Sequence, residues 1–126
     1  MPSLPSEPLR IELSWPAPEL WPNASSHRMV VHRFRKAAKR ESGWATVAAL
    51  QHNRSWAPAA ETVAVHLIAH PKPFGPHPDA DNLIAACKGA IDGIALKLGI
   101  NDRLFQAPTV EWADRCERGK LVVVLS

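Results

Sequence analysis

Apolar and polar residues alternate with period two near the start of the chain, over residues 9–15. This alternation is typical of a strand with one face in the core, and Pro16 ends it. Residues 63–69 are almost continuously apolar and rich in β-branched side chains, which predicts a strand in the centre of a sheet. Two further strands are expected to close the chain, over residues 109–115 and 120–125.

Two segments carry apolar residues at helical spacing. The first covers residues 27–50, and Ser25 or Ser26 is placed to cap its start. The second covers residues 82–98, and Gly99 can end it. The expected core-facing residues are Val30, Phe34, Ala37, Ala38 and Ala45 on the first helix and Leu83, Cys87, Ala90, Ile91, Ile94 and Leu98 on the second.

The order of these elements defines the expected fold class. Four prolines fall within residues 70–78, so this segment is expected to be a stiff, irregular loop. The order strand, helix, strand, helix, strand, strand predicts an α/β (α+β) fold, with a small mixed sheet of about four strands and two helices packed on it. A chain of 126 residues is long enough for one core. We expect a flexible N-terminal segment over residues 1–8 and a single domain over residues 9–126.

Positive charge is concentrated on the first helix. The chain has 15 Lys and Arg against 12 Asp and Glu, yet six of the cations and none of the acids fall between His27 and Arg40. Five basic residues of this helix follow helical spacing and form a stripe that is either an ordinary solvated face or a contact surface for a polyanion such as DNA. The candidate DNA contacts on this stripe are Arg28, His32, Arg35, Lys36 and Lys39.

Several classes of protein are disfavoured by patterns that the sequence lacks. Cys87 and Cys116 have neither CxxC spacing nor a nearby pair of histidines, which argues against a zinc site or a disulfide framework and fits reduced thiols in a cytoplasmic protein. There is no signal-peptide pattern, and no apolar run reaches the roughly 18 residues of a membrane span. We therefore expect no membrane insertion. A glycine-rich phosphate loop, GxSxG and HExxH are also absent, so other familiar catalytic routes have no support and we expect no nucleotide cofactor.

Two carboxylates one residue apart, Asp79 and Asp81, stand at the start of the second helix. Such a pair attracts a hard divalent cation, but acids at a helix start also cap free amides and favour the helix dipole. Hard cations need three or more oxygen ligands, and Asp102, just past the far end of the helix, is the candidate third. The alternative is that Asp102 is an ordinary turn residue. Whether Glu111 or Asp114 adds a ligand is left open.

Lys88 follows Asp81 by seven residues, which returns it to the same helix face about 10 Å along the axis. Helical side chains lean toward the N-terminus, so its ammonium would point back at the acids. Alternatively, Lys88 pairs with Asp92, four residues later. A basic surface, clustered carboxylates and a lysine are together the parts needed for phosphodiester hydrolysis with Mg²⁺. The scattered histidines indicate no metal site, and His66, within an apolar strand, is expected to be a satisfied core residue.

The segment Asp79-Ala80-Asp81-Asn82-Leu83, the helix with Lys88 and Asp92, and the turn Gly99-Ile100-Asn101-Asp102 together resemble the RusA-type Holliday-junction resolvases. These are small endonucleases, many of them phage-borne. The opening strand, the loop before the basic helix and the two closing strands agree more loosely, so the resemblance spans most of residues 9–125. In many members the lysine stands where this chain has Ala85, and positions 85 and 88 project within about 60° of each other on a helix.

The resemblance implies a homodimer that binds four-way DNA junctions and cuts two strands symmetrically in DNA recombination and repair, with Mg²⁺ or Mn²⁺. It assigns metal binding to Asp79, Asp81 and Asp102, and catalysis to these acids and Lys88. Further candidate DNA contacts are Asn23, Lys72 and Asn82. It also implies a cytoplasmic location in a bacterial or phage-infected cell. The alternatives are a junction-binding or DNA-binding protein with impaired catalysis and a small metal-dependent phosphohydrolase.

Overall fold

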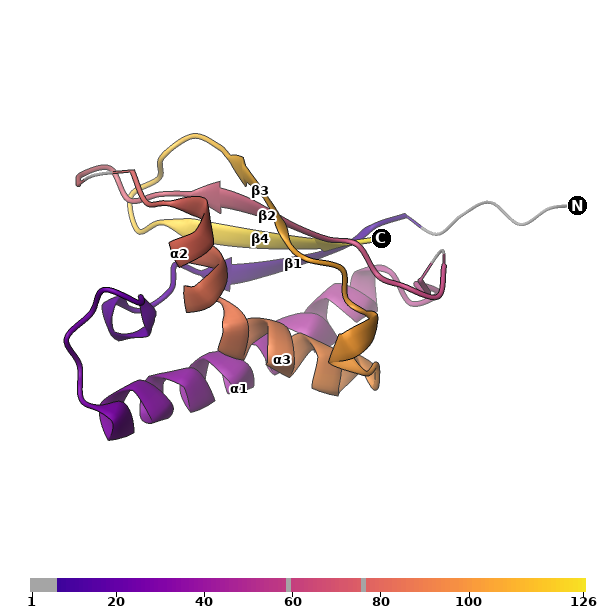
Figure 1. Cartoon of the computed structure of the whole chain (residues 1–126). Helices are drawn as coiled ribbons and strands as arrows, with labels where there is room; N and C mark the ends of the chain where they lie inside the picture. Colours follow the sequence, from indigo (N-terminus) through magenta and orange to yellow (C-terminus); the bar gives the residue numbers. More distant parts are fainter. Residues whose placement is uncertain (1–6, 59, 76) are drawn as a thin grey trace, which may run out of the picture.

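The computed structural model describes residues 7–58, 60–75 and 77–126, which form a four-stranded sheet with helices on one face (Figure 1). The predicted order of elements is confirmed, except that the second helix is divided in two. Most of the predicted N-terminal segment, residues 1–6, lies outside the described residues. Within those residues, no helix combines the length and apolar character needed to cross a membrane. The elements are β1 (Leu9–Ser14), η1 (Pro18–Leu20), α1 (Arg28–His52), β2 (Val65–His70), α2 (Ala80–Ala86), α3 (Lys88–Leu98), η2 (Asp102–Leu104), β3 (Thr109–Trp112) and β4 (Lys120–Leu125).

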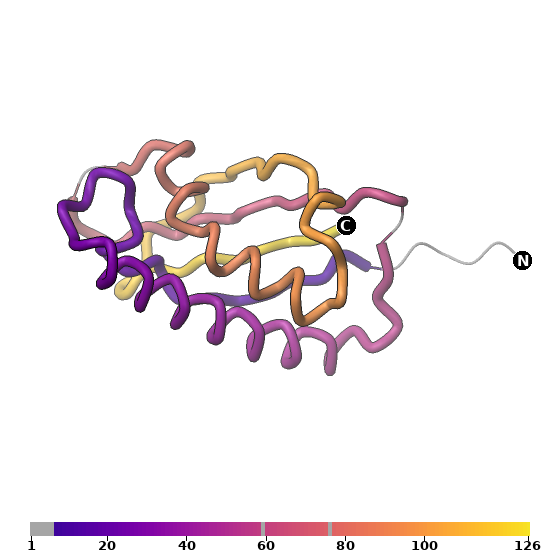
Figure 2. Tube along the Cα trace, turned by 60° about the horizontal axis from the view of Figure 1, so that its bottom comes forward, coloured from indigo at the N-terminus to yellow at the C-terminus, as the bar shows by residue number. Residues whose placement is uncertain are grey.

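The sheet has the order β1-β4-β2-β3, with β4 antiparallel to both of its neighbours and β2 parallel to β3. The strand predicted from residues 63–69 is therefore central, as expected. In β1, buried and exposed residues alternate, as its sequence pattern predicts. In β2, Val65, Leu67 and Ala69 are buried, while the residues between them are only partly covered. The reason is that α1 and α3 cover one face of the sheet (Figure 2).

His66 lies on the open face of β2, so its predicted place in the core is wrong. One ring nitrogen lies 2.6 Å from Thr109 Oγ1 and the other 3.1 Å from Glu111 Oε1, both on β3. The prediction that its polar atoms are satisfied is confirmed. The error arises because a nearly continuous apolar run suggests a strand buried on both faces, whereas the helices cover only one.

The start of α1 agrees with the prediction, but its cap does not. Neither Ser25 nor Ser26 caps the helix. His27, which has an extended backbone, accepts a hydrogen bond from the Met29 backbone N–H at Nδ1, over 3.1 Å. An imidazole nitrogen thus takes the place of the hydroxyl that usually satisfies a free amide at a helix start.

The buried side of α1 also differs from the prediction at its centre. The fully buried positions are Ser42, Gly43 and Thr46, whereas Ala37 is exposed. The hydroxyls of Ser42 and Thr46 donate to the carbonyls of Lys39 and Ser42, at 3.1 and 2.7 Å, so they are satisfied within their own helix. Small residues occupy these positions because α1 meets α3 at close range. The other predicted core residues of α1, which are Val30, Phe34, Ala38 and Ala45, are partly buried.

The second predicted helix is two helices, with a break at Cys87. This residue has φ −90° and ψ −1°, and its N–H is shared between carbonyls of the preceding turn. A Cβ added to Gly89 or Gly93 would clash with α1, so the break allows α3 to turn along α1 and set both glycines against it. Gly99, with φ 70°, ends α3 as predicted. Of the predicted core residues here, Leu83, Cys87, Ala90 and Ile94 are buried, and Ile91 and Leu98 are partly buried.

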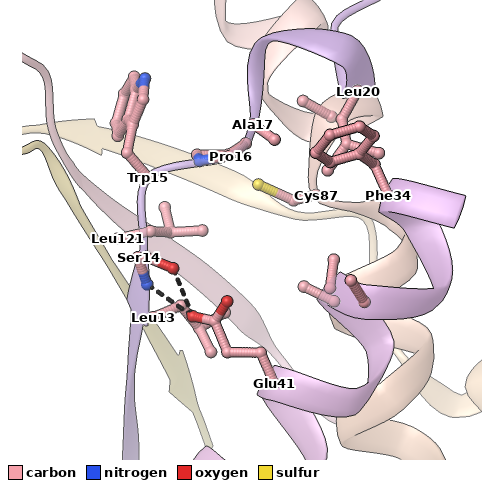
Figure 3. Close-up of a pocket in the computed structure, with 14 residues that line it drawn as sticks. Leu13, Ser14, Trp15, Pro16, Ala17, Leu20, Phe34, Glu41, Cys87 and Leu121 are labelled. Atoms are coloured by element: carbon pink, nitrogen blue, oxygen red, sulfur yellow. Dashed lines mark hydrogen bonds between the residues drawn. The ribbon is translucent and has the colours of Figure 1, made fainter. Parts of the chain in front are cut away.

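An apolar cavity of about 180 Å³ lies where β1 ends, between η1, α1 and the break at Cys87 (Figure 3). The Glu41 carboxylate lies at its edge and accepts hydrogen bonds from the Ser14 backbone N–H at 2.9 Å and from the Ser14 hydroxyl at 2.5 Å. Burial raises the pKa of the Cys87 thiol to about 12, which keeps it protonated and chemically inert. Glu41 therefore ties the end of β1 to α1, and Cys87 acts as a small apolar residue.

Candidate functional site

Asp79 and Asp81 lie at the start of α2, directly after the proline-rich segment that follows β2. Asp79 is the N-cap, and its Oδ1 accepts a hydrogen bond of 3.1 Å from the Asp81 backbone N–H. Asp81 lies in the first turn, and both residues are exposed. The capping interpretation is therefore confirmed for Asp79. It uses one oxygen and leaves the other three carboxylate oxygens of the pair without a hydrogen-bond partner among the described residues.

Lys88, Asp92 and Asp102 line one groove of about 310 Å³, which extends from α2 and α3 to the segment before β3. Lys88 is the first residue of α3 and Asp102 the first of η2, and both are exposed. The alternative ion pair between Lys88 and Asp92 is not formed, since the ion pairs of the described residues lie elsewhere. Neither Glu111 nor Asp114 lines this groove. Lys88 therefore lines the groove without an ion-pair partner among the described residues.

The structure brings Lys88 and Asp102 together but leaves Asp79 and Asp81 outside their groove. Ala85, which lines the groove, follows Asp81 by about one helical turn on α2. In the part of the chain that the structure describes, no group of three or more His, Cys, Asp or Glu side chains could hold a metal ion. The assignment of Asp102 as a third metal ligand stays a prediction.

A second groove, of about 670 Å³, gathers the candidate DNA contacts Asn23, Lys72 and Asn82 from distant parts of the sequence. Asn82 follows Asp81 directly in the chain, but neither Asp79 nor Asp81 lines this groove. Arg115 lines it as well, and its guanidinium donates to the carbonyls of Lys72 at 2.8 Å and of Gly75 at 3.3 Å. The sequence gives no signal for Arg115, because this contact joins segments 40 or more residues apart.

The basic stripe on α1 is exposed, as predicted, but only part of it lines a groove. Lys36 and Lys39 line a third groove, of about 790 Å³, between α1 and α3. The other predicted members, Arg28, His32 and Arg35, do not line it. Three cations that the prediction did not include do: Arg33, Arg40 and Lys97. Arg33 and Arg40 are seven residues apart on one helix, so the sequence spacing could have placed them on one face. Lys97 comes from a different helix, so no spacing in the sequence links it to them.

Comparison with known proteins finds a similar protein in Xylella fastidiosa. The chain is 35% identical over 120 residues to an uncharacterized protein of Xylella fastidiosa (strain Temecula1 / ATCC 700964). The matched region covers 92% of this chain and 74% of the Xylella protein. No model of a protein family matches the chain.

Proposed function

The chain belongs to the same protein family as the uncharacterized Xylella fastidiosa protein, and we propose that it is a divalent-metal-dependent endodeoxyribonuclease acting on four-way DNA junctions. The observation that carries the proposal is the position of Asp79 and Asp81 at the start of α2, close in the chain to residues that line two different grooves. Asn82, next to the pair, lines the groove with Lys72, and Ala85, one turn later, lines the groove with Lys88. A phosphodiester bound at the acids and extending into these grooves would meet Lys72 in one groove and Lys88 in the other. The resemblance to RusA-type resolvases supports the same function.

The oxygen donors of Asp79 and Asp81 fit Mg²⁺. This ion prefers carboxylate oxygens, keeps several of its waters, and is usually held by one or two carboxylates together with substrate phosphates. Asp79 has one oxygen beyond its cap bond, and Asp81 has both. When bound, the ion supplies a water of lowered pKa and neutralises charge on the phosphate. Mn²⁺, which also accepts oxygen ligands, can substitute.

Lys88 is proposed to stabilise the negative charge that develops on the phosphate or on the leaving oxygen. Its ammonium is exposed in the groove and makes no ion pair there. A cation at such a position attracts the negative charge that develops in the transition state. Asp102, in the same groove, is proposed as the further carboxylate of the site.

The remaining polar residues are proposed to position the DNA. Asn23, Lys72 and Asn82 share one groove, from which they can contact backbone phosphates. Contacts of this kind fix the register of the substrate but carry no sequence information. Because one chain supplies one acidic pair, two symmetric nicks require two copies, and we propose a homodimer with a two-fold axis. The proposed setting is DNA recombination and repair in the cytoplasm of a bacterial or phage-infected cell.

The proposal is tested with a labelled four-way junction and a linear duplex of matched sequence. With Mg²⁺ or Mn²⁺ the protein should cut the junction in paired, symmetric positions, cut the duplex little, and cut neither in EDTA. Lys88→Ala should slow junction cleavage while leaving junction binding in EDTA unchanged. Arg118→Ala, which removes an exposed cation that lines none of the three grooves, is the matched control. Cleavage by Lys88→Ala at the wild-type rate would contradict the role of Lys88.

A junction-binding protein without catalysis is the second candidate. It is favoured by the finding that Lys88 lies in a groove that Asp79 and Asp81 do not line. Such a protein would bind junctions with an affinity that falls as salt increases, and would give no product with any divalent metal.

A further inference from the structure

The third groove exists because α1 and α3 approach each other closely. A Cβ on Gly89 would lie 2.7 Å from Arg35 Cγ and 2.9 Å from the Arg35 carbonyl oxygen, and a Cβ on Gly93 would clash with Lys39 and Ser42. Because both positions are glycine, the two backbones can pack without side chains between them. The two helices run side by side (Figure 2). The long side chains beside their line of contact form the walls of a groove along the pair.

The walls of this groove are strongly cationic. Arg33, Lys36, Lys39 and Arg40 come from α1 and Lys97 comes from α3, and all five are exposed. No Asp or Glu is among the described residues that line it. Cations gathered without counter-charges raise the local concentration of a polyanion and are not explained by the stability of the fold.

Trp44 gives the groove a second feature, an aromatic surface open to solvent. Its exposed fraction is 67%, which is high for a large apolar side chain, and it lines the same groove. Lys97 Nζ lies 5.4 Å from the centroid of the indole ring, in the range of a cation–π contact. The ring is thus held among the cations without being buried by the protein.

We propose that this groove binds single-stranded nucleic acid, with an unpaired base stacked on Trp44 and the backbone phosphates following the cations of α1 and Lys97. An aromatic platform within a basic groove matches what single strands offer, a π-face on every base and one charge per nucleotide. A closed duplex offers the charges but keeps its bases stacked inside. An acidic peptide offers the charges without the planar face. The groove is separate from the acidic pair, so this inference holds whether or not the protein cuts junctions.

The test is fluorescence anisotropy of a short fluorescein-labelled oligothymidylate with the full chain in EDTA, where no cleavage takes place. Trp44→Ala should weaken binding by roughly 5- to 150-fold, the usual effect of removing one stacking partner. Trp44→Phe should retain most of the affinity, because it keeps an aromatic face. Lys36→Ala should weaken binding and lower the slope of log K against log salt by about 0.7, as expected when one phosphate contact is lost. Arg118→Ala should bind as the wild type does.

Three results would overturn the proposal. One is a Trp44→Ala protein, with an unchanged melting temperature, that binds the oligonucleotide as tightly as the wild type. Another is a loss of affinity by Trp44→Ala that is equal for single strand and duplex. The third is displacement of the labelled strand by polyglutamate as readily as by unlabelled oligothymidylate. Junction cleavage with Mg²⁺, measured on the same variants, shows separately whether the proposed nuclease activity stands.

Discussion

Replacing Gly93 with alanine should destabilise the fold by about 2 kcal/mol, although alanine is the better helix former. A Cβ at this position would meet the carbonyl of Lys39 and the hydroxyl of the fully buried Ser42, both on α1. The hydroxyl can rotate away, but the carbonyl belongs to the helix backbone and cannot. The two helices would have to move apart.

The magnitude follows from two opposing effects. Forcing an extra carbon into a packed contact costs about 1–3 kcal/mol, and the upper end applies because one of the opposing atoms belongs to the backbone. Removing a glycine from a helix interior stabilises by about 0.5–1 kcal/mol. The difference is a net loss of about 2 kcal/mol at Gly93.

Gly43→Ala is the matched control, since Gly43 also lies inside a helix at the same interface. There an added Cβ would lie 3.6 Å from Lys97 Cε, an ordinary contact with the end of a flexible side chain. This variant should gain about 0.5–1 kcal/mol. Urea unfolding of the three proteins measures the difference, provided that their m-values agree. Equal stability of the two variants would refute the account of how α1 and α3 pack.

The remaining predictions concern the cavity at the end of β1. Burial raises the Cys87 pKa from 9.0 to about 12, so the unfolded chain loses its proton first and stability falls as pH rises from 9 toward 12. Between pH 8 and pH 10 the loss should be about 1 kcal/mol by urea unfolding, and Cys87→Ala should abolish that part of the pH dependence. A thiol reagent should modify the half-buried Cys116 in the native protein and Cys87 only after unfolding. Glu41→Ala should lose about 1 kcal/mol, because the exposed Ser14 can exchange its partner for water, and Glu117→Ala should lose none.

The strands could be predicted from the sequence because period two and β-branched runs are local signals. β1 and β4 begin where the pattern places them, and the described residues between β2 and α2 form neither helix nor strand, although His70, which the prediction placed in this loop, ends β2. The break at Cys87 has no local signal, since no proline stands near it. It depends on packing between α1 and α3, which brings Gly89 and Gly93 against residues about 50 positions earlier in the chain.

The candidate site divides in the same way. The acids, Lys88 and the basic stripe are visible as residue types at helical or turn spacing. That Lys36, Lys72 and Lys88 line three separate grooves depends on the helix break and on loop contacts such as that of Arg115 with Lys72. The part played by Trp44 and Lys97 becomes evident only when two helices lie side by side.

Cleavage of a labelled four-way junction by Asp81→Asn tests the central claim most directly. The substitution keeps the shape of the side chain and removes the charge, and the capping bond from the Asp81 backbone to Asp79 does not depend on it. With Mg²⁺, the account predicts a loss of cleavage of roughly a hundredfold or more, with junction binding in EDTA unchanged and with Glu117→Gln as active as the wild type. Cleavage by Asp81→Asn at the wild-type rate would contradict it.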